Sequence, residues 1–88
     1  MENIKIEDKI IKVGDILVLK TDSPQLGEQL APKDNSPPPM KQGTELIVDS
    51  IRKYPDGVHI NFETKLGPVT IYQFALENMF NDEYISLK

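Results

Sequence analysis

The 88-residue chain contains no cysteine and no tryptophan, and it has a single histidine. The absence of cysteine excludes disulfide bonds, thiolate zinc sites and thiol nucleophiles. Long apolar runs are also missing, because the longest, Ile16–Leu19, is far too short to cross a membrane. The N-terminal segment, residues 1–10, mixes charged and apolar side chains and lacks the apolar stretch of a signal peptide. We therefore expect no membrane segment and a cytoplasmic location, which is the host cytoplasm if the protein is viral.

The chain also has fewer basic than acidic residues: ten Lys and Arg against fourteen Asp and Glu, which gives a net charge of −4. Nucleic-acid-binding domains rely on clustered basic side chains, because phosphate contacts supply most of their affinity. Here only Arg52 and Lys53 are adjacent. The acidic balance favours a protein partner. A nucleic-acid-associated small β-barrel is the alternative, and its contacts would be the dispersed basic residues Lys12, Lys20, Arg52, Lys53 and Lys65.

Residues that carry chemistry are few. His59 lies among the polar positions of a strand-like segment, residues 58–63, and no Ser or Cys pattern beside it indicates a nucleophile. The acidic groups at residues 7–8 and 81–83 lack the spacing of a calcium loop, and the isolated glycines form no phosphate-binding loop. We therefore expect no enzyme activity, catalytic residue, metal or cofactor. A small enzyme or ligand-binding barrel is a third hypothesis, which a pocket joining His59 to a carboxylate would favour.

Short apolar segments separated by turn residues predict strands throughout one domain, residues 1–88. The segment 16–20 is apolar on both faces, which indicates a central or covered strand. The next strand, residues 44–54, brings Leu46, Val48 and Ile51 to one face if a bulge lies near Asp49 and Ser50.

The second half of the chain continues this pattern. Pro55, Asp56 and Gly57 predict a tight hairpin into the alternating segment 58–63. A turn at Gly67 then leads to a strand over 69–74. Residues 76–80 change to helical spacing, which predicts one helical or 3₁₀ turn. A short strand that contains Ile85 and Leu87 closes the chain.

Residues 21–43 hold five of the seven prolines. Proline removes backbone donors and pushes its neighbours out of the helical region, so this segment predicts a loop of roughly twenty residues. Leu26, Leu30 and Met40 are its apolar tethers to the body of the domain. Residues 37–39 form a short polyproline II limb, which we expect to act as a groove wall rather than as a peptide ligand.

The order of strand, long loop, strand, tight hairpin, strand, turn, strand, helical turn and strand resembles the SH3-like small barrel. The segments "KVGD" and "GTELIVDSI…DGVHINFE" are similar to small KOW and SH3-like proteins of bacteria and their phages. The resemblance implies an all-β fold: an SH3-like barrel of about five antiparallel strands with a long RT-type loop and a 3₁₀ or helical turn before the last strand. The "ALYDY" segment and paired tryptophans of eukaryotic SH3 domains are absent, so proline-peptide binding is not implied. The other candidate is an OB-fold, which needs a helix between its third and fourth strands.

We expect a small protein-interaction module, a phage or bacterial accessory protein, that exists as a monomer or weak dimer. Aromatic side chains are enriched at protein interfaces, although tyrosines of a barrel can also be half-buried structural residues. The candidate partner-binding residues are Tyr54, Tyr72, Tyr84, Pro38 and Met40.

Overall fold

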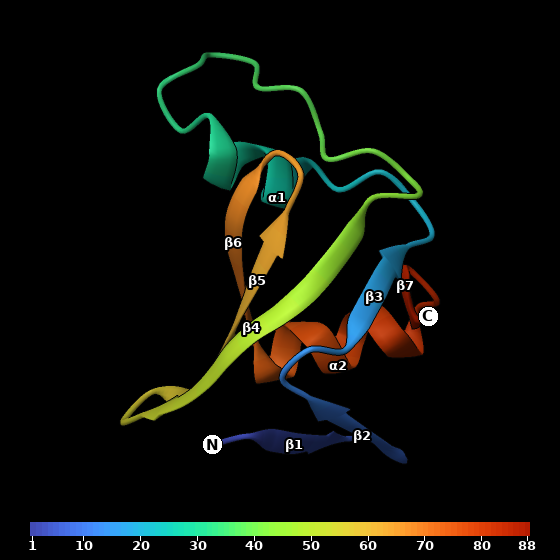
Figure 1. Ribbon diagram of the computed structural model, residues 1–88. Helices are drawn as coiled ribbons and strands as arrows, with labels where there is room; N and C mark the ends of the chain where they lie inside the picture. The colour runs from blue at the N-terminus through green and yellow to red at the C-terminus, as the bar shows by residue number, and fades with distance from the viewer.

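A computed structural model describes all residues from 1 to 88 (Figure 1). It contains seven strands and two helices. In chain order these are β1 (Asn3–Ile6), β2 (Lys9–Lys12), β3 (Ile16–Leu19), α1 (Pro24–Leu30), β4 (Glu45–Tyr54), β5 (Gly57–Thr64), β6 (Gly67–Tyr72), α2 (Gln73–Asn81) and β7 (Ile85–Leu87). Neither helix is long and apolar enough to span a membrane.

Five of the strands form one antiparallel sheet in the order β6-β5-β4-β3-β7. β1 and β2 form a separate two-stranded hairpin, which lies beneath α2 in Figure 1. The prediction of a mostly β chain built on five antiparallel strands is confirmed. The ladder runs linearly from β6 to β7, and these two strands are its edges.

The hairpin between β4 and β5 forms as predicted. Tyr54 pairs with Gly57 across the turn, and Gly57 adopts a φ of 128°, which a side chain would make costly. The register of β4 shifts between Val48 and Ser50, so the predicted bulge is present. As a result Val48 and Ile51 both point into the core, although they are three positions apart in the chain, which in a regular strand would place them on opposite faces.

The predicted loop over residues 21–43 contains a helix, α1, so its assignment as wholly irregular was wrong. The hydroxyl of Ser23 caps the helix by accepting a hydrogen bond from the Leu26 N–H at 3.3 Å. Pro24 occupies the first turn, where its missing N–H costs nothing. Leu26 is buried, Leu30 packs against the core, and Ser23 pairs with Met40 by two backbone hydrogen bonds of 2.8 and 2.9 Å. The prediction that this segment folds back on the body is therefore confirmed.

The single helical turn predicted over residues 76–80 is also corrected. α2 has nine residues, and β6 ends at Tyr72, so Phe74 belongs to the helix and not to the strand. Residues 73–81 include no glycine, proline or β-branched side chain, and this composition favours a longer helix.

The hairpin of β1 and β2 was not predicted. Its turn consists of Glu7 and Asp8, and Glu7 takes a φ of 57° in the left-handed region. Glycine or asparagine usually supplies that conformation, so the sequence gives no turn signal here. Ile4, Ile6 and Ile11 hold the hairpin by burying their side chains.

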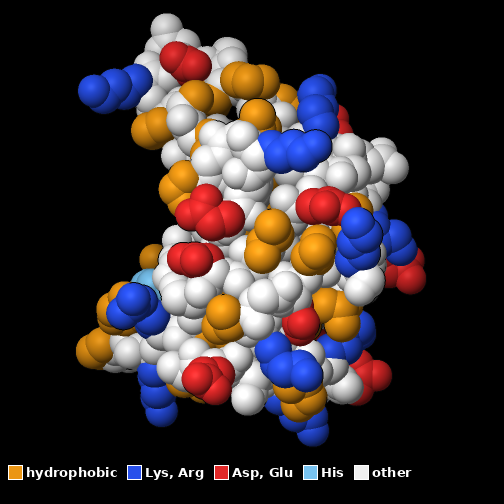
Figure 2. Space-filling model, viewed as in Figure 1, with side chains coloured by type: hydrophobic (Ala, Val, Ile, Leu, Met, Phe, Trp, Pro, Cys, Tyr) orange, Lys and Arg blue, Asp and Glu red, His pale blue; other side chains and the backbone are white.

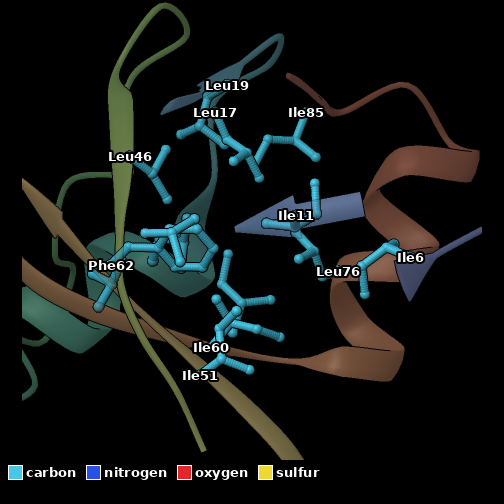
Figure 3. Close-up of a cluster of buried hydrophobic side chains, with 14 of the residues drawn as sticks. Ile6, Ile11, Leu17, Leu19, Leu46, Ile51, Ile60, Phe62, Leu76 and Ile85 are labelled. Carbon is cyan, nitrogen blue, oxygen red and sulfur yellow. The ribbon is translucent and has the colours of Figure 1, made fainter. Parts of the chain in front are cut away.

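One core of sixteen apolar side chains unites these elements. In Figure 3, Ile51, Ile60 and Phe62 project from the sheet toward the helix and the hairpin. Leu76 of α2 lies beside Ile6, and Ile11 faces the sheet side chains in the same view. α2 thus packs against β5, β6 and β7 and also against β1.

Candidate functional site

A groove of about 1000 Å³ lies between α1, the end of β6 and α2. Its apolar wall includes Leu26 from α1, Ile71 from β6, and Ala75 and Met79 from α2. The segment that leads from β3 into α1, residues 21–23, also lines the groove. The groove therefore depends on the helix that sequence reasoning had assigned to a loop.

The direct junction of β6 with α2 places two aromatic rings at the groove. Tyr72 ends the strand and is also the N-cap of the helix, so no linker separates the two elements. Tyr72 is 42% exposed and Phe74 is 63% exposed, and both line the groove. Tyr84, which follows α2, lines it as well.

Three adjacent strands carry a row of contacting rings, of which His59 and Tyr72 line the groove. His59 of β5 pairs directly with Tyr72 of β6, and their rings stack at a centroid distance of 4.2 Å and an interplanar angle of 10°. The Tyr54 ring of β4 lies 4.5 Å from His59 on a tilted plane. Phe74 extends the row with an edge contact to Tyr72 at 6.0 Å. Such offset and edge geometries are the favourable arrangements for aromatic pairs.

The His59 imidazole also contacts a carboxylate. Its Nε2 lies 3.1 Å from Oδ1 of Asp56, and this is the ring's one hydrogen bond in the structure. Asp56 thereby fixes the orientation of the imidazole ring, which a histidine needs in order to act as a general base. No hydroxyl group lies within hydrogen-bonding distance of the ring, so the pair has no side-chain nucleophile to activate.

The side chain of Gln29 bridges α1 to the edge of the sheet. Its Nε2 donates to the Thr70 carbonyl oxygen at 2.8 Å, and its Oε1 accepts from the Thr70 N–H at 2.8 Å. Both residues line the groove. The amide therefore satisfies both backbone groups of a residue on β6.

Charge in the groove has one sign. Asp22 and Asp82 are the only charged side chains that line it. A smaller hollow shares Tyr72 and Phe74 with the groove and adds Asp56 and Glu77. No Lys or Arg lines either hollow, although Lys41 lies 3.6 Å from Asp22 at the rim.

The structure places the predicted partner-binding residues in different settings. Tyr72 and Tyr84 line the groove, and Tyr54 joins Tyr72 through His59. Pro38 is exposed on the returning limb but does not line the groove. Met40 is only 1% exposed, so its side chain belongs to the core and is not available to a partner.

The basic residues considered for nucleic-acid binding lie elsewhere. All of them are exposed and none lines the groove; only Arg52 and Lys53 share an element, the strand β4, and the others are Lys12, Lys20 and Lys65. Figure 2 shows basic and acidic side chains interspersed over the viewed face. The structure contains no group of three or more His, Asp or Glu side chains placed to hold a metal ion.

Sequence reasoning missed Phe74, Gln25 and Gln29 as groove residues. The signal for the two glutamines was the Ser23–Pro24 helix start, followed by Pro32 as a stop. No protein-family model, curated protein or solved structure matches the chain.

Proposed function

We propose that this chain is a non-enzymatic protein-interaction module whose groove binds a segment of a partner protein. The observation that carries the proposal is the cluster of exposed aromatic rings over a concave site. Tyr72, Phe74 and Tyr84 are each more than two-fifths exposed, and all three line the groove. Exposed aromatic side chains around a hollow are typical of surfaces that become buried against a partner.

The chemistry of the groove favours a basic partner segment with apolar anchors. The four carboxylates of the two hollows face no lining Lys or Arg. Complementary charge would steer a basic segment to this face and raise its association rate. The rings and the apolar wall would take the anchoring side chains.

We also propose that the fold is a variant of the SH3-like barrel of small bacterial or phage accessory proteins. Support comes from the chain order of the sheet strands, with the long connection between β3 and β4 and a helix before β7. The open edges and the nine-residue α2 are the points at which this chain departs from the expected pattern.

A displayed library of random linear peptides tests the proposed function. We expect the wild-type chain to select peptides that combine Lys or Arg with apolar residues. Phe74→Ala should weaken binding of a selected peptide about tenfold or more, because truncation of a central interface aromatic has effects of this size. Leu66→Ala is the matched control, since Leu66 is equally exposed at 65% but lies outside the groove. Equal effects of the two substitutions, or no selected peptide, would contradict the proposal.

The Asp56–His59 pair favours a second candidate, a general-base site that acts on a bound small molecule. A bound water would have to serve as the nucleophile, because the ring contacts no hydroxyl. Hydrolysis of p-nitrophenyl acetate by the wild-type chain and by His59→Gln tests this candidate. Equal rates for the two proteins would reject it.

Nucleic acid is the partner class that the charge distribution favours least. The five candidate basic residues are not gathered at the groove, and phosphate binding needs gathered positive charge. A gel-shift titration at low salt with double- and single-stranded DNA checks this point. A shift that weakens steeply with salt would replace the protein-partner proposal.

A further inference from the structure

The strand β6 forms one edge of the five-stranded sheet, so its backbone has only one strand neighbour. Residues of an antiparallel strand alternate in direction, and every second residue points its N–H and C=O away from the partner strand. Thr70 is such a residue, because both of its backbone groups bond to Gln29 and not to β5. Pro68 and Tyr72, two positions to either side, therefore face outward as well.

The outward groups of β6 form a short and defined pairing edge. They comprise the Pro68 carbonyl, both groups of Thr70, and the Tyr72 N–H. Pro68 has no N–H to offer, and proline is tolerated at such outward positions of edge strands. The Tyr72 carbonyl begins α2, since an N-cap carbonyl accepts the first helical hydrogen bond. The edge thus offers acceptor, donor, acceptor and donor in sequence, beside the groove.

Gln29 occupies the central part of this edge in the way that another strand would. A primary amide presents a carbonyl and an N–H as a peptide unit does, and the Gln29 amide makes both bonds to Thr70 at 2.8 Å. Gln29 is an exposed side chain on a seven-residue helix. α1 itself packs against β6, and Leu30 lies beside Gly67. An added strand therefore pairs with Thr70 only if the end of α1 moves off this edge together with the Gln29 amide, while Leu26 stays buried in the core.

We infer that the partner segment binds as an added strand on β6, with its backbone taking the two hydrogen bonds that Gln29 makes in the free chain. This inference rests on the proposed function and specifies its binding mode. Strand addition draws affinity from main-chain hydrogen bonds and specificity from alternate side chains. The alternate side chains meet the acidic groove and its aromatic rings, so the occupant is an extended segment in which basic and apolar residues alternate.

Backbone N-methylation of a library-selected peptide tests the binding mode. An N-methyl group removes a donor and blocks strand pairing, so we expect binding losses of about tenfold or more at alternate positions only. In NMR titrations, the backbone amides of Thr70 and Tyr72 should shift and become protected from hydrogen exchange. Binding that is lost in Phe74→Ala but shows no alternation and no change at these amides would overturn strand addition. It would leave the interaction module itself intact.

A second variant tests the role of Gln29. Gln29→Ala removes the competing amide, and we expect selected peptides to bind this variant about tenfold more tightly, because two exposed hydrogen bonds no longer need to be broken. Gln42→Ala is the matched control, since Gln42 is an exposed glutamine that lines neither hollow and whose side chain makes no bond to β6. Unchanged or weaker binding of the Gln29 variant, with α1 intact by NMR, would overturn the inference.

Concentration-dependent dimers with protected Thr70 amides and no peptide binding would assign the edge to a second copy of this chain instead.

Discussion

Every strand of the five-stranded sheet buries at least one apolar side chain, whereas the connection between β3 and β4 is held at a few points. The buried side chains of the sheet are Leu17, Leu19, Leu46, Val48, Ile51, Ile60, Phe62, Val69, Ile71 and Ile85. The connection relies on the Ser23 cap, on the burial of Leu26 and Met40, and on one close backbone approach. Stability is therefore distributed in the sheet and concentrated in the connection.

The close approach joins α1 to the proline limb. Gly27 has no side chain, and a Cβ at this position would overlap the Pro38 carbonyl oxygen and lie 2.8 Å from the Pro39 Cα. Both neighbours are backbone atoms of a stiff segment, so they cannot yield as a side-chain tip would. The methyl group of an alanine at position 27 would push the proline limb away from α1. It would not touch the contacts within the sheet.

The largest effect is expected from truncation in the sheet. Phe62 is fully buried at the centre of the core, so Phe62→Ala should lower the free energy of unfolding by about 3–5 kcal/mol. Urea denaturation followed by circular dichroism gives this value. Glu63→Ala, at the exposed neighbouring position, should change it by less than about 0.5 kcal/mol. A small effect of the Phe62 substitution would show that the core is not the shared support of the sheet.

Gly27→Ala should act on the connection with a smaller cost of about 1–3 kcal/mol, which is typical of overpacking. We expect rapid proteolysis between Leu26 and Lys41 in this variant, while the wild-type chain resists cleavage there. The exposed neighbour Glu28 provides the control substitution Glu28→Ala, which should behave as the wild type does. If the sheet amides lost hydrogen-exchange protection together with the connection, the two regions would not be separable.

Ser23→Ala probes the weaker contact at the start of α1. Loss of the cap should cost about 1 kcal/mol, because the Leu26 N–H loses its side-chain acceptor. Hydrogen exchange at the amides of residues 26–30 measures the local effect. Ser36→Ala, an exposed position of the same connection, should leave these rates unchanged. Equal exchange rates in the two variants would mean that the cap contributes nothing to α1.

The smallest effect concerns a surface ion pair that joins the ends of β4 and β7. The Lys88 ammonium donates to the Glu45 carboxylate and lowers the pKa of that carboxyl group below its ordinary value. Any stability from this pair is present above the ordinary pKa of Glu45, and it is lost as the pH falls through the lowered pKa. Lys88→Gln should return the pKa toward its ordinary value in an NMR titration, with little change in stability because both groups are exposed. Lys33→Gln is the control. An unchanged Glu45 pKa in Lys88→Gln would show that the pair does not form in solution.

The segments that were predictable from the sequence carry local signals. Val58, Ile60 and Phe62 alternate with polar residues, and Pro55 and Gly57 mark the hairpin, so β5 and its turn follow from neighbouring residues alone. The bulge in β4 follows in the same way from the spacing of its apolar residues.

The groove could not be predicted because its parts are distant in the chain. Gln29 and Thr70 are 41 residues apart, and no local pattern reports their contact. The prolines of the connection were interpreted as loop residues, although Pro24 is placed where a helix begins. Phe74 continues the sequence alternation of β6, and this pattern predicts a strand through residue 74. The structure instead has Phe74 in α2, because the helix packs on the sheet directly after Tyr72.

The bulge in β4 also has a consequence for chain length. Val48 pairs with Phe62 and Ser50 pairs with Asn61, so Asp49 has no partner on β5. Deletion of Asp49 would make these two pairs consecutive and leave Val48 and Ile51 on the same face. A one-residue gap in the middle of a strand normally inverts everything beyond it. Deletion of the one residue Asp49 should therefore leave both the strand register and the core side chains of the sheet in place.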